Sequence, residues 1–252
     1  MSPRQTELWI LRAGSCLVDW SVVVRGEPRG RLVTFPVWMY LLRGPDALAL
    51  VDTGMPTRCI GDDRFFDGTD DESLILPRMT EADTLEAVLG RQGVQVSDID
   101  FLISTHWHFD HAGGNQAFRG KPILVHPDEI ACAQAGHPYP PECRHMSLDY
   151  REVRDGDSPL PGVRLLHTPG HTPGHLSLLV DPADAAPVLL TVDAVYTEVN
   201  WLQDIPGAMA DSSLGERSVQ RLREIAKSSG AQVFFGHDPA QCDRMEWQAL
   251  RG

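Results

Sequence analysis

The chain of 252 residues consists mainly of short apolar runs separated by polar segments rich in glycine and proline. Runs of this kind, enriched in valine, isoleucine and leucine and bounded by turn residues, predict β-strands. Strands are expected at 7–14, 16–24, 32–42, 47–51, 98–105, 121–126, 163–167, 176–180, 188–192 and 231–235. The pattern therefore predicts a protein rich in β-sheet.

Helical spacing of apolar residues is confined to a few segments. The clearest is 213–229, an amphipathic pattern that ends at Gly230. Shorter helices are expected at 80–93, 112–118 and 127–135. Because strands occur in runs with helices interspersed, an α/β protein with two mixed sheets packed between helices, an αββα sandwich, fits better than an alternating doubly wound sheet. No repeat or linker interrupts the pattern, so residues 1–252 are expected to form a single domain.

Two segments break all periodicity. Residues 57–80 are polar and rich in glycine and aspartate, and residues 136–149 contain several prolines. Both are expected to be surface loops. For 57–80, which contains Phe65 and Phe66, one interpretation is a loop that covers a substrate, and the other is a connection without a function of its own.

Composition narrows the classes of function. The net charge of -13 repels phosphate backbones, so we expect no nucleic-acid partner and a small neutral or cationic substrate instead. No window approaches the roughly 18 apolar residues of a membrane span, and the amino terminus lacks the apolar core of a signal peptide. The cysteines are scattered without a C-x-x-C pair, which favours reduced thiols in the cytoplasm over disulfides or a thiolate metal cage. A monomer or a homodimer is expected.

The densest group of metal-binding residue types lies directly after an apolar run, within 104–115. In an extended segment His106, His108 and Asp110 would point the same way, while His111 would need a turn to join them. A pair of glycines follows and permits such a turn. Two histidines are too few to hold zinc, because catalytic zinc sites typically take three protein ligands and leave a position open for water.

Further ligands must come from elsewhere in the chain. His171 lies in a turn rich in proline and glycine, and Asp193 and His237 each follow a predicted buried strand. Nitrogen and oxygen donors suit zinc, and iron, cobalt and manganese are compatible with them. Asp52, at another strand end, is interpreted equally as a turn residue or as one that orients a ligand. The other histidines are expected, taken singly, to be surface or satisfied core residues: His126, His137, His145, His167 and His175.

The motif His106-x-His108-x-Asp110-His111, with the later His171, Asp193 and His237, resembles the metallo-β-lactamase superfamily. Further phrases narrow the resemblance to its N-acyl homoserine lactone lactonases, the quorum-quenching enzymes. These are Pro36-Val37-Trp38-x-Tyr40-Leu41-Leu42, Val51-Asp52-Thr53-Gly54-Met55-Pro56, Ile75-Leu76-Pro77-x-Met79-Thr80, His108-Phe109-Asp110-His111-Ala112-Gly113-Gly114-Asn115, Asp193-Ala194-x-Tyr196-Thr197 and Phe234-Phe235-Gly236-His237-Asp238. The resemblance covers nearly the whole chain and implies an αββα sandwich with its metals at one edge of the two sheets.

Carried over residue by residue, the resemblance implies two divalent metal ions, with zinc favoured and cobalt, manganese or iron compatible. The first ion would be bound by His106, His108 and His171, the second by Asp110, His111 and His237, and Asp193 would bridge them. His175 would be structural or would orient a ligand.

The implied reaction is the opening of N-acyl homoserine lactones to N-acyl homoserines. Tyr196 would donate to the developing oxyanion or position the ring, the alternative being a packed aromatic residue, and Asp110 would also carry a proton to the leaving ring oxygen. Residues 17–20, 57–74 and 136–149, which would line the acyl side, match only in part, so the preferred chain length stays open.

Other classes of protein remain as alternatives. The nearest is another lactonase or a thioesterase on the same fold. A redox di-iron protein would normally carry glutamate in place of one histidine, and His108 argues against it. A metal-free binding module would have lost ligands, and this chain has kept them.

Overall fold

The computed structural model describes residues 6–136, 139–182, 185–203 and 207–244, with side chains through Gln241. Its strands form two sheets. In the seven-stranded sheet the spatial order is β4 (Ile75–Arg78), β1 (Glu7–Asp19), β2 (Leu32–Arg43), β3 (Leu48–Val51), β5 (Phe101–Ile103), β6 (Ile123–Val125) and β7 (Tyr150–Glu152). In the four-stranded sheet it is β11 (Gln232–Phe235), β10 (Val188–Val192), β9 (Leu176–Val180) and β8 (Val163–His167).

Both sheets are mixed. The strands from β4 to β3 pair antiparallel, whereas those from β3 to β7 run parallel. In the smaller sheet β8, β9 and β10 are antiparallel, and β10 and β11 are parallel. Ligands of open α/β sheets bind beyond the carboxyl ends of such parallel strands. The segments that follow β5, β10 and β11 are therefore the first places to look for a site.

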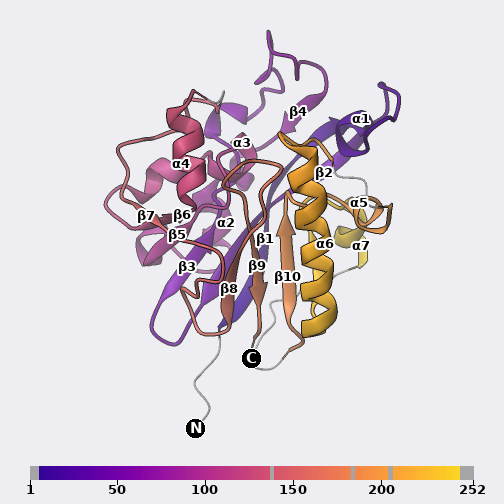
Figure 1. Cartoon of the computed structure of the whole chain (residues 1–252). Helices are drawn as coiled ribbons and strands as arrows, with labels where there is room; N and C mark the ends of the chain where they lie inside the picture. The colour runs from indigo at the N-terminus through magenta and orange to yellow at the C-terminus, as the bar shows by residue number, and fades with distance from the viewer. Residues whose placement is uncertain (1–5, 137–138, 183–184, 204–206, 245–252) are drawn as a thin grey trace.

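The helices connect and cover the strands. They are α1 (Trp20–Val23), α2 (Leu85–Gly90), α3 (Phe109–Ala112), α4 (Pro127–Gln134), α5 (Glu198–Gln203), α6 (Ser212–Ser229) and α7 (Pro239–Arg244), with 3-10 turns at Thr57–Cys59, Glu81–Asp83, Val96–Asp98 and Asn115–Phe118. The long α6 stands beside the smaller sheet in Figure 1. Among the described residues, no helix combines the length and the apolar character needed to cross a membrane.

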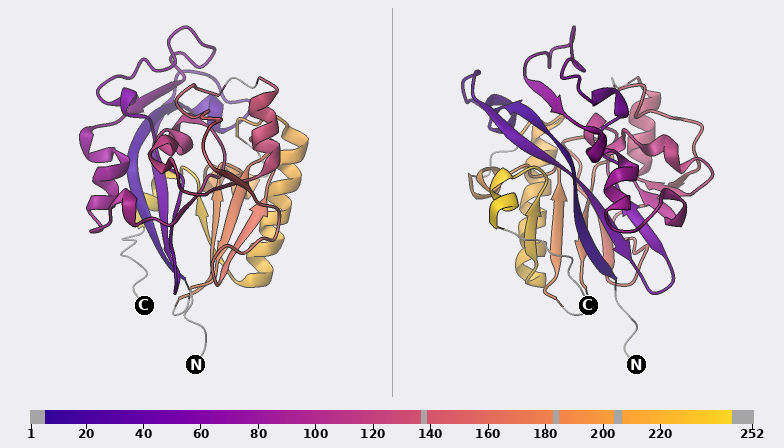
Figure 2. Two further views of the ribbon diagram at one scale, coloured as in Figure 1. Left: turned by 90° about the vertical axis from the view of Figure 1, so that its left-hand side faces the viewer. Right: turned by 180° about the vertical axis from the view of Figure 1, so that it is seen from behind.

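Four layers enclose three apolar clusters. Figure 2 shows the two sheets face to face, with α2 outside the larger sheet and α6 outside the smaller one. Alternate residues of β2 belong to different clusters, because successive side chains of a strand point to opposite faces. Val37 and Met39 pack on the α2 side, while Trp38 and Tyr40 pack between the sheets. The predicted αββα sandwich is confirmed.

Some predicted strands are confirmed to the residue. The expected strands 163–167, 176–180 and 188–192 coincide with β8, β9 and β10. Leu178 and Leu190 face the larger sheet, while Leu179 and Leu189 face α6. Every residue of β9 and β10 is buried, which explains why these two strands are almost wholly apolar in the sequence, whereas Arg164 of β8 is exposed.

The amino-terminal prediction of two strands, 7–14 and 16–24, was wrong. The structure has a single strand, β1, whose pairing register shifts between Arg12 and Ser15, and then the short helix α1. The strand ends because the Asp19 side chain accepts a hydrogen bond from the backbone nitrogen of Ser21 at 3.0 Å and so caps α1.

Short elements were missed or displaced. The expected loop 57–80 contains β4, which pairs with β1, and β7, α5 and α7 were not expected at all. The expected helix 112–118 is replaced by α3, which begins at Phe109, and by the 3-10 turn Asn115–Phe118. These elements are short and lack a clear apolar run or helical period, so tertiary contacts decide them.

The turn between β8 and β9 approaches the backbone of α6 closely at a pair of glycines. Gly170 has a φ of +139°, and a Cβ there would lie 2.4 Å from the Cα of Gly215 in α6. The contact is held by hydrogen bonds from the backbone nitrogen of Asp211 to the Gly170 carbonyl oxygen at 2.9 Å and from Ser218 Oγ to the Pro169 carbonyl oxygen at 2.7 Å. This close approach fixes the turn that carries His171.

Gly170→Ala is expected to destabilise the protein by about 3 kcal/mol or more, since overpacking of about 1–3 kcal/mol adds to a backbone strain of about 1–3 kcal/mol. Gly120→Ala is the matched control, because Gly120 also has a positive φ, +85°, but its Cβ would meet nothing within 4 Å. Urea unfolding of both variants measures the difference. Equal losses of stability would contradict the steric role of Gly170.

Candidate metal centre

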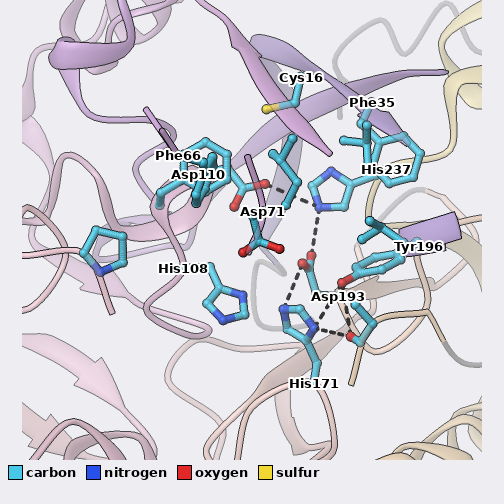
Figure 3. Close-up of a pocket in the computed structure, with 16 residues that line it drawn as sticks. Cys16, Phe35, Phe66, Asp71, His108, Asp110, His171, Asp193, Tyr196 and His237 are labelled. Carbon is cyan, nitrogen blue, oxygen red and sulfur yellow. Dashed lines mark hydrogen bonds and ion pairs between the residues drawn. The ribbon is translucent and has the colours of Figure 1, made fainter. Parts of the chain in front are cut away.

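Seven side chains from both sheets converge at the carboxyl ends of strands, as Figure 3 shows for the five of them that it labels. In chain order they are His106 and His108 after β5, Asp110 and His111 in α3, His171 between β8 and β9, Asp193 after β10 and His237 after β11. Their ligand atoms form two groups in which every pair lies within 4.8 Å: His106, His108, His171 and Asp193 in one, Asp110, His111 and His237 in the other.

Asp193 lies between the two groups and faces both. Its Oδ1 is 3.1 Å from His111 Nε2 and 3.0 Å from His237 Nε2. Its Oδ2 is 3.1 Å from His171 Nε2 and 3.7 Å from His106 Nε2. One oxygen of a single carboxylate thus serves each group, which is the arrangement that a ligand bridging two ions requires.

The histidine tautomers show that this set fits metal ions. His237 Nδ1 lies 2.8 Å from the Pro36 carbonyl oxygen, and His171 Nδ1 lies 3.0 Å from that of Ala208. A carbonyl oxygen can only accept, so each Nδ1 carries the proton and each Nε2 presents a lone pair. Both lone pairs face the Asp193 carboxylate, and an imidazole oriented by a backbone carbonyl in this way is typical of metal ligands.

Without a cation, a proton has to separate these lone pairs from the carboxylate. Burial by itself lowers the pKa of His111, but the Asp193 and Asp110 carboxylates outweigh it and raise the pKa well above its usual value. Nε2 of His111 is fully buried and forms no hydrogen bond with a described residue. A positive charge at this position is therefore required by the site, and divalent ions would supply it.

Asp52 hydrogen-bonds to His111, a member of the second group of metal-binding side chains. Its Oδ2 accepts a hydrogen bond from His111 Nδ1 at 2.8 Å, and its two oxygens accept from the backbone nitrogen and the Oγ1 of Thr105, both at 2.8 Å. Burial raises the pKa of Asp52, and the hydrogen bonds from His111 and Thr105 oppose the rise. Of the two interpretations of Asp52, the structure supports the residue that orients a ligand.

Glu129, at the start of α4, joins the two loops that carry histidines of the first group. It is fully buried. Its Oε1 accepts from the backbone nitrogen of Trp107 at 2.9 Å and from Tyr139 Oη at 2.7 Å. Its Oε2 accepts from Thr172 Oγ1 at 2.7 Å and from the backbone nitrogen of Gly174 at 3.0 Å. No pattern in the sequence pointed to this residue, because one glutamate near a helix start is ordinary.

Two residues near the metal-binding groups have strained backbone conformations. Asp52 has a φ of +60° and Val192 a φ of +48°. For a β-branched valine this left-handed conformation is an outlier, at a cost of about 1–3 kcal/mol. It turns the chain at the end of β10, so that Asp193 leaves the strand direction and enters the site. His175 Nε2 accepts the hydrogen bond from the Asp193 backbone nitrogen at 3.1 Å and fixes that turn.

Tyr196 borders the first group. Its hydroxyl lies 3.2 Å from His171 Nδ1 and donates to the Ala208 carbonyl oxygen at 3.3 Å. Burial raises the pKa of Tyr196 well above its usual value, and the charges of Asp193 and Asp110 raise it further. The hydroxyl therefore keeps its proton at neutral pH and remains a hydrogen-bond donor.

A cavity of about 270 Å³ opens in front of the two groups. Its wall contains the polar residues His108, Asp110, His171, Asp193, Tyr196 and His237 and apolar residues that include Val18, Phe35, Phe66, Ile75, Phe109 and Pro140. Asp71 also lines it and is labelled in Figure 3. Among the described residues, no hydrogen-bonding or ion-pair partner meets its carboxylate. Residues 17–20, 57–74 and 136–149 thus all contribute to the wall, as expected.

The structure also decides the positions of His111 and His175. His111 was expected to need a turn to join His106, and residues 109–112 form α3, whose helical turn brings His111 to the same site as His106. His175 is a fully buried core histidine whose two ring nitrogens are both bonded. His137 lies outside the described residues. The ligand roles of the seven residues stay predictions.

Comparison with known proteins places the chain in a family. The sequence model described as the Metallo-beta-lactamase superfamily matches residues 32–237. An N-acyl homoserine lactonase of Bacillus sp is 44% identical over 235 residues, which cover 93% of this chain and 94% of that protein. The chain belongs to the N-acyl homoserine lactonase family of this superfamily.

More distant and structural relatives agree with this membership. The N-acyl homoserine lactonase AttM of Azorhizobium caulinodans is 32% identical, with 92% of this chain and 93% of that protein covered. A crystal structure of a Bacillus thuringiensis AiiA variant with N-decanoyl-L-homoserine bound at the active site has a TM-score of 0.93 and 40% identity, covering 96% of this chain and 97% of that one. An N-acyl homoserine lactone hydrolase with N-hexanoyl-L-homoserine bound at its catalytic metal centre has a TM-score of 0.92, with 40% identity and the same coverage.

Glu129→Gln is expected to lower the free energy of unfolding of the metal-free protein by about 1–3 kcal/mol. Whichever way the new amide turns, its NH2 group faces a backbone N–H, of Trp107 or of Gly174, that has no other acceptor there. Urea unfolding in the presence of a chelator measures the loss, and metal content after dialysis should fall as well. Glu86→Gln, at an exposed position of α2, is the control, and an equal effect of the two substitutions would contradict the role of Glu129.

Proposed function

We propose that the protein hydrolyses the lactone ring of N-acyl homoserine lactones and releases N-acyl homoserines, the reaction of quorum quenching. The observation that carries the proposal is the Asp193 carboxylate facing two groups of metal-binding side chains at the floor of a cavity with an apolar wall. The relatives named above as N-acyl homoserine lactonases support it, as do the two structures with acyl homoserines at their active sites.

The residues present fit two divalent ions, for which zinc is the proposed identity because the donors are imidazole nitrogens and carboxylate oxygens. His106, His108 and His171 would hold one ion, Asp110, His111 and His237 the other, and Asp193 both. When bound, the ions would supply Lewis acidity that polarises a carbonyl oxygen and makes water a stronger nucleophile at neutral pH. Cobalt, manganese and iron remain compatible with these donors.

The side chains of the protein would orient the substrate and move protons. Hydrolysis adds a hydroxyl to the lactone carbonyl carbon, breaks the bond to the ring oxygen and leaves a proton that must reach that oxygen. Asp110 lines the cavity, with Oδ2 3.7 Å from both His111 Nε2 and His237 Nε2, and would carry this proton. Tyr196, which also lines the cavity and is protonated, would donate a hydrogen bond to the carbonyl oxygen as negative charge develops there.

The second candidate is another lactonase or a thioesterase on the same fold, since acyl transfer to water needs the same groups. An acid-release assay with short and long N-acyl homoserine lactones, a simple γ-lactone, a thioester and a β-lactam separates these possibilities. We expect the homoserine lactones to give the highest kcat/KM. The absence of acid release from every homoserine lactone would overturn the proposal.

We also propose a cellular compartment and an oligomeric state for the enzyme. Cys16, Cys59, Cys132 and Cys143 are free thiols, which supports a reducing compartment such as the cytoplasm. The side chain of Cys242 lies outside the described residues. A monomer or a homodimer is proposed, and sedimentation of the purified protein tests it.

Tyr196→Phe is expected to lower kcat at least tenfold while two metal ions per chain are retained. The loss follows from a hydrogen bond made mainly in the transition state, where one such donor is worth roughly 2.7–4 kcal/mol. Steady-state kinetics with a C6 homoserine lactone and metal analysis of the same sample provide the measurement. Unchanged turnover would instead identify Tyr196 as a packed aromatic residue.

Asp71→Leu is expected to raise the kcat/KM ratio of a C10 over a C4 homoserine lactone by about fivefold to tenfold, or about 1–1.4 kcal/mol. In the wild type, a long acyl chain against this wall would strip water from an unpaired carboxylate, which costs free energy. Asp70→Leu is the matched control, because Asp70 is exposed like Asp71 but is not among the residues that line the cavity. An equal change in both variants would mean that net charge, not the cavity wall, sets the preference.

A further inference from the structure

A third group of metal-binding side chains lies apart from the centre described above. It consists of His126, Asp128 and His167, whose ligand atoms all lie within 4.8 Å of one another. Oδ2 of Asp128 is 3.6 Å from His126 Nδ1 and 4.0 Å from His167 Nε2. The two imidazole rings are stacked, with centroids 3.7 Å apart and an interplanar angle of 10°. None of these residues has a part in the proposed hydrolysis.

The group joins two layers of the fold. His126 follows β6 of the larger sheet and caps α4, and Asp128 lies in the first turn of that helix. His167 is the last residue of β8 in the smaller sheet. These three donors, from two separate segments, converge here only because the two sheets pack together.

The spacing of the donors suits a divalent ion such as zinc, which is intermediate between hard and soft in its choice of ligands. Adjacent donors of a tetrahedral zinc site lie roughly 3.3 Å apart, given metal–ligand bonds of about 2.0–2.1 Å. The two donor separations that involve Asp128 are somewhat longer, and the two imidazoles would have to rotate out of their stacked arrangement for both lone pairs to point at one ion. The Pro173 carbonyl oxygen, 2.9 Å from His167 Nε2, is available as a fourth donor.

The ionic state and exposure of the group also fit. Burial lowers the pKa of His126, and the neighbouring His167 lowers it further, so the ring is neutral with a free lone pair at neutral pH. The Asp128 side chain is 57% exposed and that of His167 is 22% exposed, so an ion can enter from solvent and water can complete its coordination.

An ion would displace two hydrogen bonds of modest value. The Asp128 backbone nitrogen donates to His126 Nδ1 at 3.3 Å, which is long for such a bond. His167 Nε2 donates to the Pro173 carbonyl oxygen, and a change of tautomer would move this proton to Nδ1. Neither change needs a movement of the backbone.

We propose that His126, Asp128 and His167 form a third cation site, for zinc or a similar borderline divalent transition metal, separate from the hydrolytic centre. An ion there would fasten the start of α4 to the end of β8. Glu129 and the turn that carries His171 lie directly beyond these two points, so the site would stabilise the outer support of the metal centre and take no part in the chemistry.

Equilibrium dialysis of the metal-loaded enzyme against free zinc, followed by metal analysis, tests the site. His167→Gln and His126→Asn remove one donor each, and asparagine retains the ability to cap α4. His145→Gln is the matched control, a half-buried histidine outside the three groups. We expect the wild type and His145→Gln to bind one ion more per chain than His167→Gln and His126→Asn, whatever the count at the main centre.

A second measurement separates the site from general damage. Added zinc should raise the Tm of the metal-loaded wild type and of His145→Gln. For His167→Gln, the same rise in Tm should need a zinc concentration at least tenfold higher. Far-UV circular dichroism confirms that the variants are folded. Equal zinc uptake by the wild type and both donor variants, or an equal loss of one ion from His145→Gln, would overturn the proposal.

Discussion

The site depends on the interaction of the buried Asp193 carboxylate with the imidazoles that surround it. An ionised group removed from water is tolerated only where charges and hydrogen bonds compensate it. Here imidazoles from both sheets surround it, and the Nε2 lone pairs of His171 and His237 point at its oxygens. Bringing these groups together without an intervening cation is unfavourable, so the fold itself creates the demand for positive charge that metal ions satisfy.

The polar groups behind the ligands determine how accurately they are placed. Asp52 orients His111, Glu129 connects the loop of His106 with the turn of His171, and His175 secures the backbone of Asp193. Each of these groups is buried and hydrogen-bonded, so each resists displacement of the ligand that it supports. The strained φ of Val192 lies next to one of these contacts, the hydrogen bond from the Asp193 backbone nitrogen to His175.

The cavity wall and the third group of donors are carried by different parts of the fold from the main metal centre. The ends of the strands fix the hydrolytic residues, whereas the wall opposite them comes largely from loops and strand edges, where Asp71 places a charge beside apolar side chains. His126, Asp128 and His167 lie on the outer side of the supporting elements. They can affect the stability of the centre while leaving the composition of the cavity unchanged.

The sequence by itself determined the layers, the longer elements and the chemistry of the centre. Short, mainly apolar runs bounded by turn residues identified β8, β9 and β10, and the unusual density of histidines identified the loop after β5. The family phrases supplied His171, Asp193 and His237 as partners. These features are local in the chain or are matched position by position, so spacing is enough to recognise them.

Tertiary structure alone decided the rest. Whether Asp52 supports a turn or a ligand depends on His111, which is 59 residues away, and Glu129 acquires its role from four donors on three separate segments. The helical turn of α3, the strand β4 and the meeting of His126 with His167 likewise arise from packing between elements. Such contacts leave no period or motif in the sequence, because the free energy that fixes them comes from residues distant in the chain.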